Sequence, residues 1–200
     1  MNLANFLTLS RIPLLFLVVT VLILDLPWAA TVAFVAFVIG GLTDWADGWV
    51  ARRFNQVSDF GKLMDALTDK IFTLGLFITC LHMGYMPGWG LLPLLLILTR
   101  ELLITGMRLV AANKRVVLAA ERSGKIKTVF QILAIGFFLL GAMLRDDFGA
   151  DAASYQAIIA LASTFYGLAA LLTATSGLAY LRKYGFLFFE EKDGSEAAEA

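Results

Sequence analysis

The sequence predicts an all-α membrane protein with six transmembrane helices and a short N-terminal juxtamembrane helix. Hydrophobic residues make up 60% of its 200 residues, which excludes an ordinary soluble domain. A bilayer core about 30 Å thick needs roughly 20 apolar residues per helix. Six stretches approach that length, and polar residues, glycine or proline separate them.

The first predicted span is short and follows the segment MNLANFLTLSR, which we expect to lie on the membrane surface as an amphipathic helix. We expect one membrane domain over residues 1–185 and a disordered acidic cytoplasmic tail over residues 186–200. The predicted spans cover residues 10–24, 29–50, 63–83, 90–110, 127–144 and 155–181.

Basic residues predict the orientation, because cytoplasmic loops of membrane proteins are enriched in Lys and Arg. With six spans, almost all of them fall on one side, and the other side has only Arg145 among four aspartates. Both termini are therefore expected in the cytoplasm, with the protein in the inner membrane. The residues on the cytoplasmic side are Arg11, Arg52, Arg53, Lys62, Arg108, Lys114, Arg115, Arg122, Lys125, Lys127, Arg182, Lys183 and Lys192.

Four aspartates stand at the cytoplasmic ends of the second and third spans. Asp44 and Asp47 are three residues apart, and Asp65 and Asp69 four apart, so each pair shares one face of a helix. A helical hairpin would bring the pairs together, and two carboxylates ~4 Å apart repel by about 4 kcal/mol at an effective dielectric near 20. Such a cluster holds protons or metal ions, and oxygen ligands favour a hard cation such as Mg²⁺ or Mn²⁺.

The same residues form the pattern D-x2-D-G-x2-A-R-x8-G-x3-D-x3-D, which resembles the CDP-alcohol phosphotransferase family. Members are membrane enzymes that join a CDP-activated lipid to an alcohol and release CMP. The resemblance implies two divalent ions and a homodimer. The matching residues are Asp44, Asp47, Gly48, Ala51, Arg52, Gly61, Asp65 and Asp69.

The resemblance also implies roles for single residues. Asp44, Asp47 and Asp65 would bind the metals, and Asp69 would be the general base, a metal ligand or both. Singly, Asp44 and Arg52 could instead form an ion pair, and Gly48 and Ala51 could serve close helix packing. The residues expected to bind the CDP-lipid are Asn5, Thr8, Gly48, Ala51, Arg52, Ser58 and Gly61.

Three further stretches, NFLTLSRIPL, TRELLITGMR and SGKIKT, resemble bacterial phosphatidylglycerophosphate synthases. One departure is Ala66, where many of those enzymes have proline. A cationic pocket beside the metals suits an alcohol that carries its own phosphate, such as sn-glycerol 3-phosphate. The residues expected to line it are Arg100, Glu101, Thr105, Arg108, Lys125 and Lys127.

The sequence thus predicts transfer of the phosphatidyl group of CDP-diacylglycerol to sn-glycerol 3-phosphate, giving phosphatidylglycerophosphate and CMP. The other partners are membrane lipids, and we expect no nucleic-acid partner. One alternative is another acceptor alcohol, such as inositol phosphate. Another is a cation transporter, which would have carboxylates near the bilayer midplane on helices broken by Gly or Pro. Here the carboxylates stand at helix ends.

Overall fold

The computed structural model describes residues 3–53, 59–113 and 122–185. These ranges are helical and contain no strand. A 3₁₀ turn precedes the fourth α-helix, and a π-helical turn follows the fifth. The elements are α1 (Leu3–Ile23), α2 (Ala29–Arg53), α3 (Asp59–His82), η1 (Gly88–Gly90), α4 (Leu91–Asn113), α5 (Arg122–Ala142), η2 (Met143–Asp147) and α6 (Ala152–Tyr184).

Four segments within the described residues are long and apolar enough to cross a membrane, namely Phe6–Ile23, Gly88–Ala111, Ile126–Asp147 and Ala152–Tyr184. They support four of the six predicted spans. The helix α2 is apolar over the shorter stretch Ala29–Asp44, and α3 carries several charges in its first half. The six-span count therefore remains a prediction for α2 and α3, the two helices that carry the aspartate motif.

The prediction of a separate N-terminal juxtamembrane helix is wrong, because α1 runs without a break from Leu3 to Ile23. No glycine interrupts it, and Pro13 lies inside the helix. Arg11, at the expected boundary, lies within this helix and pairs with carboxylates of the two neighbouring helices.

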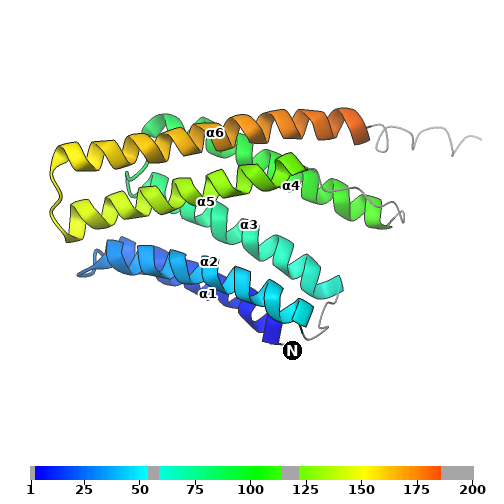
Figure 1. Ribbon diagram of the computed structural model, residues 1–200, viewed down its shortest axis with the longest axis horizontal. Coiled ribbons are helices and arrows are strands. Elements are labelled where there is room, and N and C mark those ends of the chain that lie inside the picture. Colours follow the sequence, from blue (N-terminus) through cyan, green and yellow to red (C-terminus); the bar gives the residue numbers. More distant parts are fainter. Residues whose placement is uncertain (1–2, 54–58, 114–121, 186–200) are drawn as a thin grey trace, which may run out of the picture.

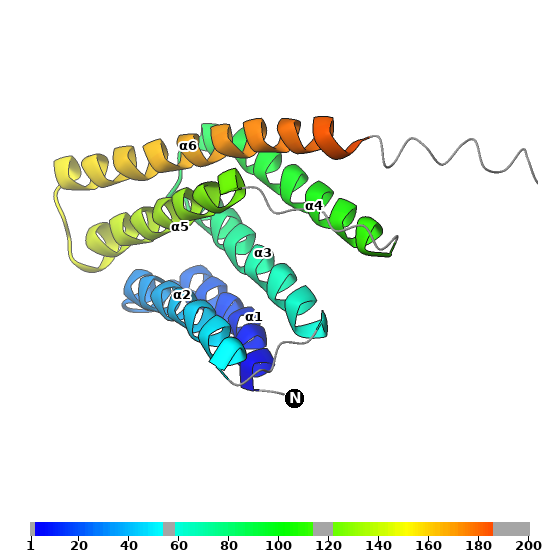
Figure 2. The ribbon, with the colours of Figure 1, turned by 45° about the vertical axis from the view of Figure 1, so that its right-hand side comes forward.

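The helices form a bundle built from two antiparallel pairs, α1 with α2 and α5 with α6 (Figures 1 and 2). Helix α5 also packs against α2 and α3, and α4 packs against α6. The N-terminus of α1, the end of α2 and the start of α3 lie at one end of the bundle in Figure 1. This arrangement gathers the motif aspartates at that end.

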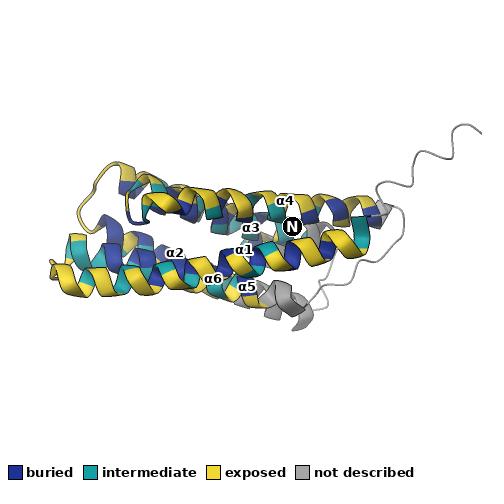
Figure 3. Ribbon diagram, turned by 90° about the horizontal axis from the view of Figure 1, so that it is seen from above, coloured by how far each residue is buried: buried dark blue, intermediate teal, exposed yellow. Residues whose placement is uncertain are grey.

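Each α-helix has buried and exposed positions (Figure 3), and large apolar side chains occupy both kinds of position. Val18, Phe77 and Leu139 are completely buried, whereas Phe16, Leu92 and Leu171 are exposed on three different helices. Large apolar side chains on an outer face suit contact with lipid, where no hydrophobic effect drives them inward. The buried Tyr166 hydroxyl donates to the Gly90 carbonyl across 2.8 Å, which fixes α6 against the start of α4.

Candidate active site

Arg11 on α1 joins two of the motif carboxylates. Its Nη1 lies 2.6 Å from Asp44 Oδ1 on α2, and its Nη2 lies 3.0 Å from Asp65 Oδ1 on α3. The Arg11 side chain is 1% exposed, whereas those of Asp44 and Asp65 are 49% and 54% exposed. A buried guanidinium needs anionic partners, and its planar fork of donors can reach two carboxylates at once. Three helices therefore meet at one charge cluster whose carboxylates remain open to solvent.

The other two motif aspartates differ in how far the structure describes them. Asp69 follows Asp65 by one turn of α3, and its side chain is partly buried. Asp47 belongs to α2, but its side chain lies outside the described residues. The structure thus brings Asp44 and Asp65 to a shared cation and places Asp69 beside them, while the site of four carboxylates stays a prediction.

A cavity of about 60 Å³ extends from this cluster into the bundle. Arg11, Asp44 and Asp69 form its polar side, and residues of α2, α3 and α5 form its apolar side. Gly40 lets α2 approach α3 here, because an added Cβ would lie 2.5 Å from Phe72 Cζ. A small residue at this point therefore sets the width of the cavity.

A second charge cluster lies on the far side of Asp69, between α4, α5 and α6. Lys127 forms an ion pair with Glu101, and Arg100 Nη1 lies 3.4 Å from the same carboxylate oxygen. Arg100 Nη2 also donates to Ser176 Oγ across 3.3 Å, beside Gly177, where a side chain would meet the arginine. Lys127 is 3% exposed, so this cluster is more enclosed than the first.

Asp69 connects the two clusters. A small polar cavity lies between α3, α4 and α5, and its lining includes Asp69, Glu101, Thr128 and Gln131. Asp69 and Thr73 line this cavity as well as the one at Arg11. Asp69 therefore lies between the Arg11 cluster, with Asp44 and Asp65, and the Glu101–Lys127 ion pair.

The remaining residues predicted for the acceptor have other described contacts. Thr105 Oγ1 donates to the Glu101 carbonyl across 2.7 Å, which is a helix-internal bond. Arg108 is exposed, and its guanidinium lies 5.8 Å from the centre of the Tyr180 ring on α6. The Lys125 side chain lies outside the described residues. Of the predicted set, Glu101 borders the small cavity and holds Lys127 beside it.

The residues predicted for the CDP-lipid are only partly described. Thr8 is buried on α1, one turn before Arg11, and Gly61 lies in the first turn of α3. Thr8 is thus three residues before Arg11 in α1, and Gly61 four residues before Asp65 in α3. The side chains of Asn5, Ala51 and Arg52, the surroundings of Gly48 and the whole of Ser58 lie outside the described residues.

Comparison with protein-family models matches residues 1–175 to the CDP-alcohol phosphatidyltransferase family. The chain belongs to this family. Its match to the family model includes all of α1 to α5 and most of α6. Both charge clusters therefore lie inside the CDP-alcohol phosphatidyltransferase region.

Curated relatives agree with the family match, and each of the three below is named CDP-diacylglycerol–glycerol-3-phosphate 3-phosphatidyltransferase. The Bacillus subtilis (strain 168) protein is 35% identical over 151 residues, covering 70% of this chain and 77% of the relative. The Rickettsia bellii protein is 29% identical, covering 90% and 94%. The Salmonella choleraesuis protein is 31% identical, covering 90% and 93%.

We next ask whether the carboxylates of the aspartate motif could bind a divalent ion. Among the described residues, no three His, Cys, Asp or Glu side chains lie close enough to hold one. Asp44 and Asp65 nevertheless direct carboxylate oxygens from neighbouring helices at one cationic group, and both are open to solvent. Hard divalent ions prefer such oxygen ligands. Asp44 and Asp65 therefore supply two oxygen ligands of the kind that a divalent ion prefers.

Arg11 is one of the residues whose role the sequence does not show. The distribution of basic residues predicts only its cytoplasmic position, whereas its guanidinium is a buried part of the carboxylate cluster. A usable signal existed, because an ionisable residue inside an apolar helix indicates function. The apolar segment Phe6–Ile23 contains Arg11 in its first half.

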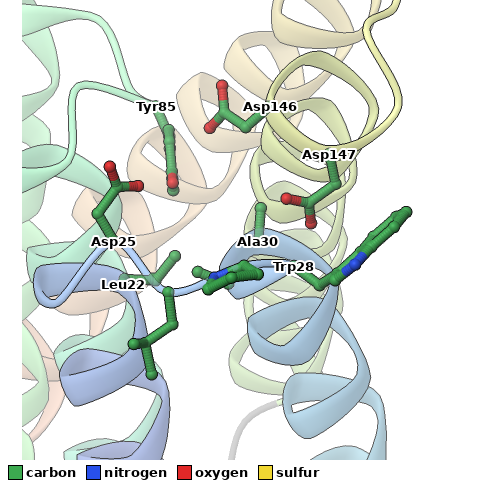
Figure 4. Close-up of a pocket in the computed structure, with 10 residues that line it drawn as sticks. Leu22, Asp25, Trp28, Ala30, Tyr85, Asp146 and Asp147 are labelled. Carbon is green, nitrogen blue, oxygen red and sulfur yellow. The ribbon is translucent and has the colours of Figure 1, made fainter.

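A larger cavity of about 330 Å³ lies at the opposite end of the bundle, lined by Asp25, Tyr85, Asp146 and Asp147 (Figure 4). Two of these carboxylates, Asp146 and Asp147, have structural contacts. Asp147 Oδ2 accepts from the amide and hydroxyl of Thr31, both at 2.6 Å, which caps the start of α2. Asp146 pairs with Arg145, and burial raises the pKa of the Tyr85 hydroxyl. The cluster at the aspartate motif therefore remains the candidate active site.

Proposed function

We propose that this protein transfers the phosphatidyl group of CDP-diacylglycerol to sn-glycerol 3-phosphate, forming phosphatidylglycerophosphate and CMP. The observation that carries the proposal is the position of Asp69, between the Asp44–Arg11–Asp65 cluster and the Glu101–Lys127 pair. One side suits a metal-bound pyrophosphate, and the other suits an acceptor that carries a phosphate. The names of the relatives support the same two substrates.

Asp44, Asp47, Asp65 and Asp69 would hold the divalent ions, which we take to be two Mg²⁺ or Mn²⁺. Such ions neutralise pyrophosphate charge and stabilise the leaving phosphate. Arg11 keeps Asp44 and Asp65 side by side, so the carboxylates are positioned before the substrate binds. We assign the CDP-lipid to this cluster and to Asn5, Thr8, Gly48, Ala51, Arg52, Ser58 and Gly61.

Asp69 would accept the proton of the attacking hydroxyl. The acceptor oxygen then bonds to the lipid-side phosphorus, and the bond from that phosphorus to the bridging oxygen breaks. CMP leaves with the bridging oxygen and its electron pair. No serine or cysteine nucleophile with an adjacent histidine is found among the described residues, which favours direct displacement in a ternary complex over a covalent intermediate.

The acceptor phosphate would bind the cations of α4 and α5. Lys127 pairs with Glu101, which lines the small cavity, and Lys70 lines the cavity itself, so both cations lie close enough to the cavity for this role. Arg100, Thr105, Arg108 and Lys125 remain part of the proposed acceptor site. Inositol phosphate would offer a similar phosphate to these cations, whereas a cation transporter would not need a phosphate site beside the carboxylates.

The orientation follows from the same proposal. We place the protein in the inner membrane with both termini and the active site at the cytoplasmic face, where glycerol 3-phosphate would be supplied from water. Membrane lipids surround the apolar outer faces, and a homodimer is expected from the family. The segment 186–200, proposed as a disordered tail, lies outside the described residues.

The proposal is tested by CMP release from purified protein with CDP-diacylglycerol and a panel of alcohols. Glycerol 3-phosphate should be the best acceptor, and phosphatidylglycerophosphate should appear in equal amount to CMP. A clear preference for inositol phosphate, or for an alcohol without a phosphate, would overturn the acceptor assignment. If no alcohol in the panel leads to CMP release, the proposed transfer is overturned.

A further inference from the structure

Gln131 on α5 carries a buried amide nitrogen that lacks a hydrogen-bond partner among the described residues. The residue is 4% exposed, so bulk water does not supply one. Most buried polar groups in proteins are hydrogen-bonded, and an unpaired buried donor is unfavourable for stability. The amide nitrogen of Gln131 is therefore a donor that a group entering the neighbouring cavity could satisfy.

The side chain lines the small polar cavity beside Asp69, together with Glu101 and Thr128. The cavity has a volume of about 20 Å³. A space of that size holds one water-sized group when polar partners surround it. The cavity is therefore too small for glycerol 3-phosphate but large enough for one of its hydroxyl groups.

The position of Asp69 indicates which hydroxyl group this is. The reacting hydroxyl must meet the lipid phosphorus, so it belongs on the side of Asp69 that faces Arg11 and Asp44. The small cavity lies on the other side. Glycerol 3-phosphate has one further hydroxyl, on the neighbouring carbon, and this group can enter the small cavity.

We propose that the Gln131 amide donates a hydrogen bond to the non-reacting secondary hydroxyl of the acceptor. The inference rests on the proposed transfer to glycerol 3-phosphate, and it makes Gln131 a specificity-determining residue. The enzyme would then select acceptors that carry a hydroxyl next to the reacting one. An acceptor without it leaves the buried amide unpaired in the complex.

The experiment compares two acceptors and two proteins. The acceptors are glycerol 3-phosphate and 3-hydroxypropyl phosphate, which lacks only the secondary hydroxyl. The proteins are the wild type and Gln131→Met, which has a similar size but no donor. We expect the wild type to favour glycerol 3-phosphate by about 3- to 10-fold in kcat/KM, the effect of one neutral hydrogen bond. In Q131M this preference should disappear.

A structural role for Gln131 makes a different prediction, because it would lower activity with both acceptors and keep their ratio. We also expect Q131M to unfold at the same or a higher temperature, since it removes an unpaired buried donor. The matched control is Leu133→Met, on an exposed position of the same helix, which should leave the ratio and the rates unchanged.

An unchanged acceptor ratio in Q131M overturns the inference, whatever its overall activity. If Q131M does not fold, the ratio in Gln131→Leu decides in the same way. Failure of the wild type to release CMP with glycerol 3-phosphate would instead overturn the proposed function. The two failures are therefore distinguishable.

Discussion

Arg11 on α1 donates to Asp65 on α3 across 3.0 Å, although 54 residues separate them in the sequence. The guanidinium is enclosed, and the carboxylate is half exposed. With Asp44 as the second partner, the pair ties the N-terminal helix to the two helices of the aspartate motif.

Replacing Arg11 should destabilise the protein as well as inactivate it. Arg11→Met removes hydrogen bonds to two charged groups, and one such bond typically contributes about 1.5–3 kcal/mol. Because both carboxylates reach solvent, we expect a loss of that size rather than the sum of two bonds. The unfolding midpoint in detergent measures it.

Arg145→Met is the control for this prediction. Its ion pair with Asp146 is 38% and 33% exposed, and pairs near the surface contribute about 0–1 kcal/mol. An Arg11→Met protein as stable as Arg145→Met would show that the Arg11 cluster does not hold the three helices together.

Metal removal should abolish activity. A chelator in excess should stop CMP release, and Mg²⁺ or Mn²⁺ should restore it, because the carboxylates can hold pyrophosphate only through cations. Asp44→Asn or Asp65→Asn should each lower the rate by orders of magnitude in folded protein. Full activity in excess EDTA would contradict the assignment of the metal site.

Asp69→Asn should lower kcat and kcat/KM to a similar degree, because proton transfer to Asp69 belongs to the transition state. Initial-rate kinetics with both substrates varied should show a ternary complex. Ping-pong kinetics, or a phosphatidyl group trapped on the protein, would argue against direct displacement.

Lys127→Met should weaken binding of the acceptor and not of the CDP-lipid. Loss of one charge-assisted hydrogen bond costs ~1.5–3 kcal/mol, so KM for glycerol 3-phosphate should rise about 10- to 150-fold. The KM for CDP-diacylglycerol should change little. Arg52→Ala, within the CDP-lipid motif, should have the opposite effect.

Arg108→Ala tests whether Arg108 binds the acceptor or packs α4 against α6. The sequence places Arg108 in the acceptor pocket, whereas its described contact is with the ring of Tyr180. A rise in the acceptor KM as large as that of Lys127→Met would support the pocket. An unchanged KM would assign Arg108 to packing between α4 and α6.

The aspartate motif could be predicted from the sequence because its chemistry depends on local spacing. Asp65 and Asp69 share a helix face whatever surrounds them. Apolar length predicted six spans, and four of them coincide with helices that are long and apolar enough to cross a membrane. The contact of Arg11 with Asp44 and Asp65 depends instead on how α1 packs against α2 and α3. Hydropathy does not encode that packing.

Gln131 shows the same limit at the acceptor side. Its position in an apolar helix marks it as unusual, but only the packed structure shows that its amide nitrogen is buried without a described partner. Lys127 was predicted from its charge, whereas its ion pair with Glu101 depends on the approach of α4 and α5.

The Arg11 cluster has a consequence for how the enzyme assembles. Without bound ions, closely spaced carboxylates would push the helices that carry them apart. Arg11 acts as a built-in counterion in that state, so the bundle can assemble without metal. A divalent ion held by Asp44 and Asp65 would then take the place of Arg11 as their partner, and its loss would stop the reaction while the three helices stay joined.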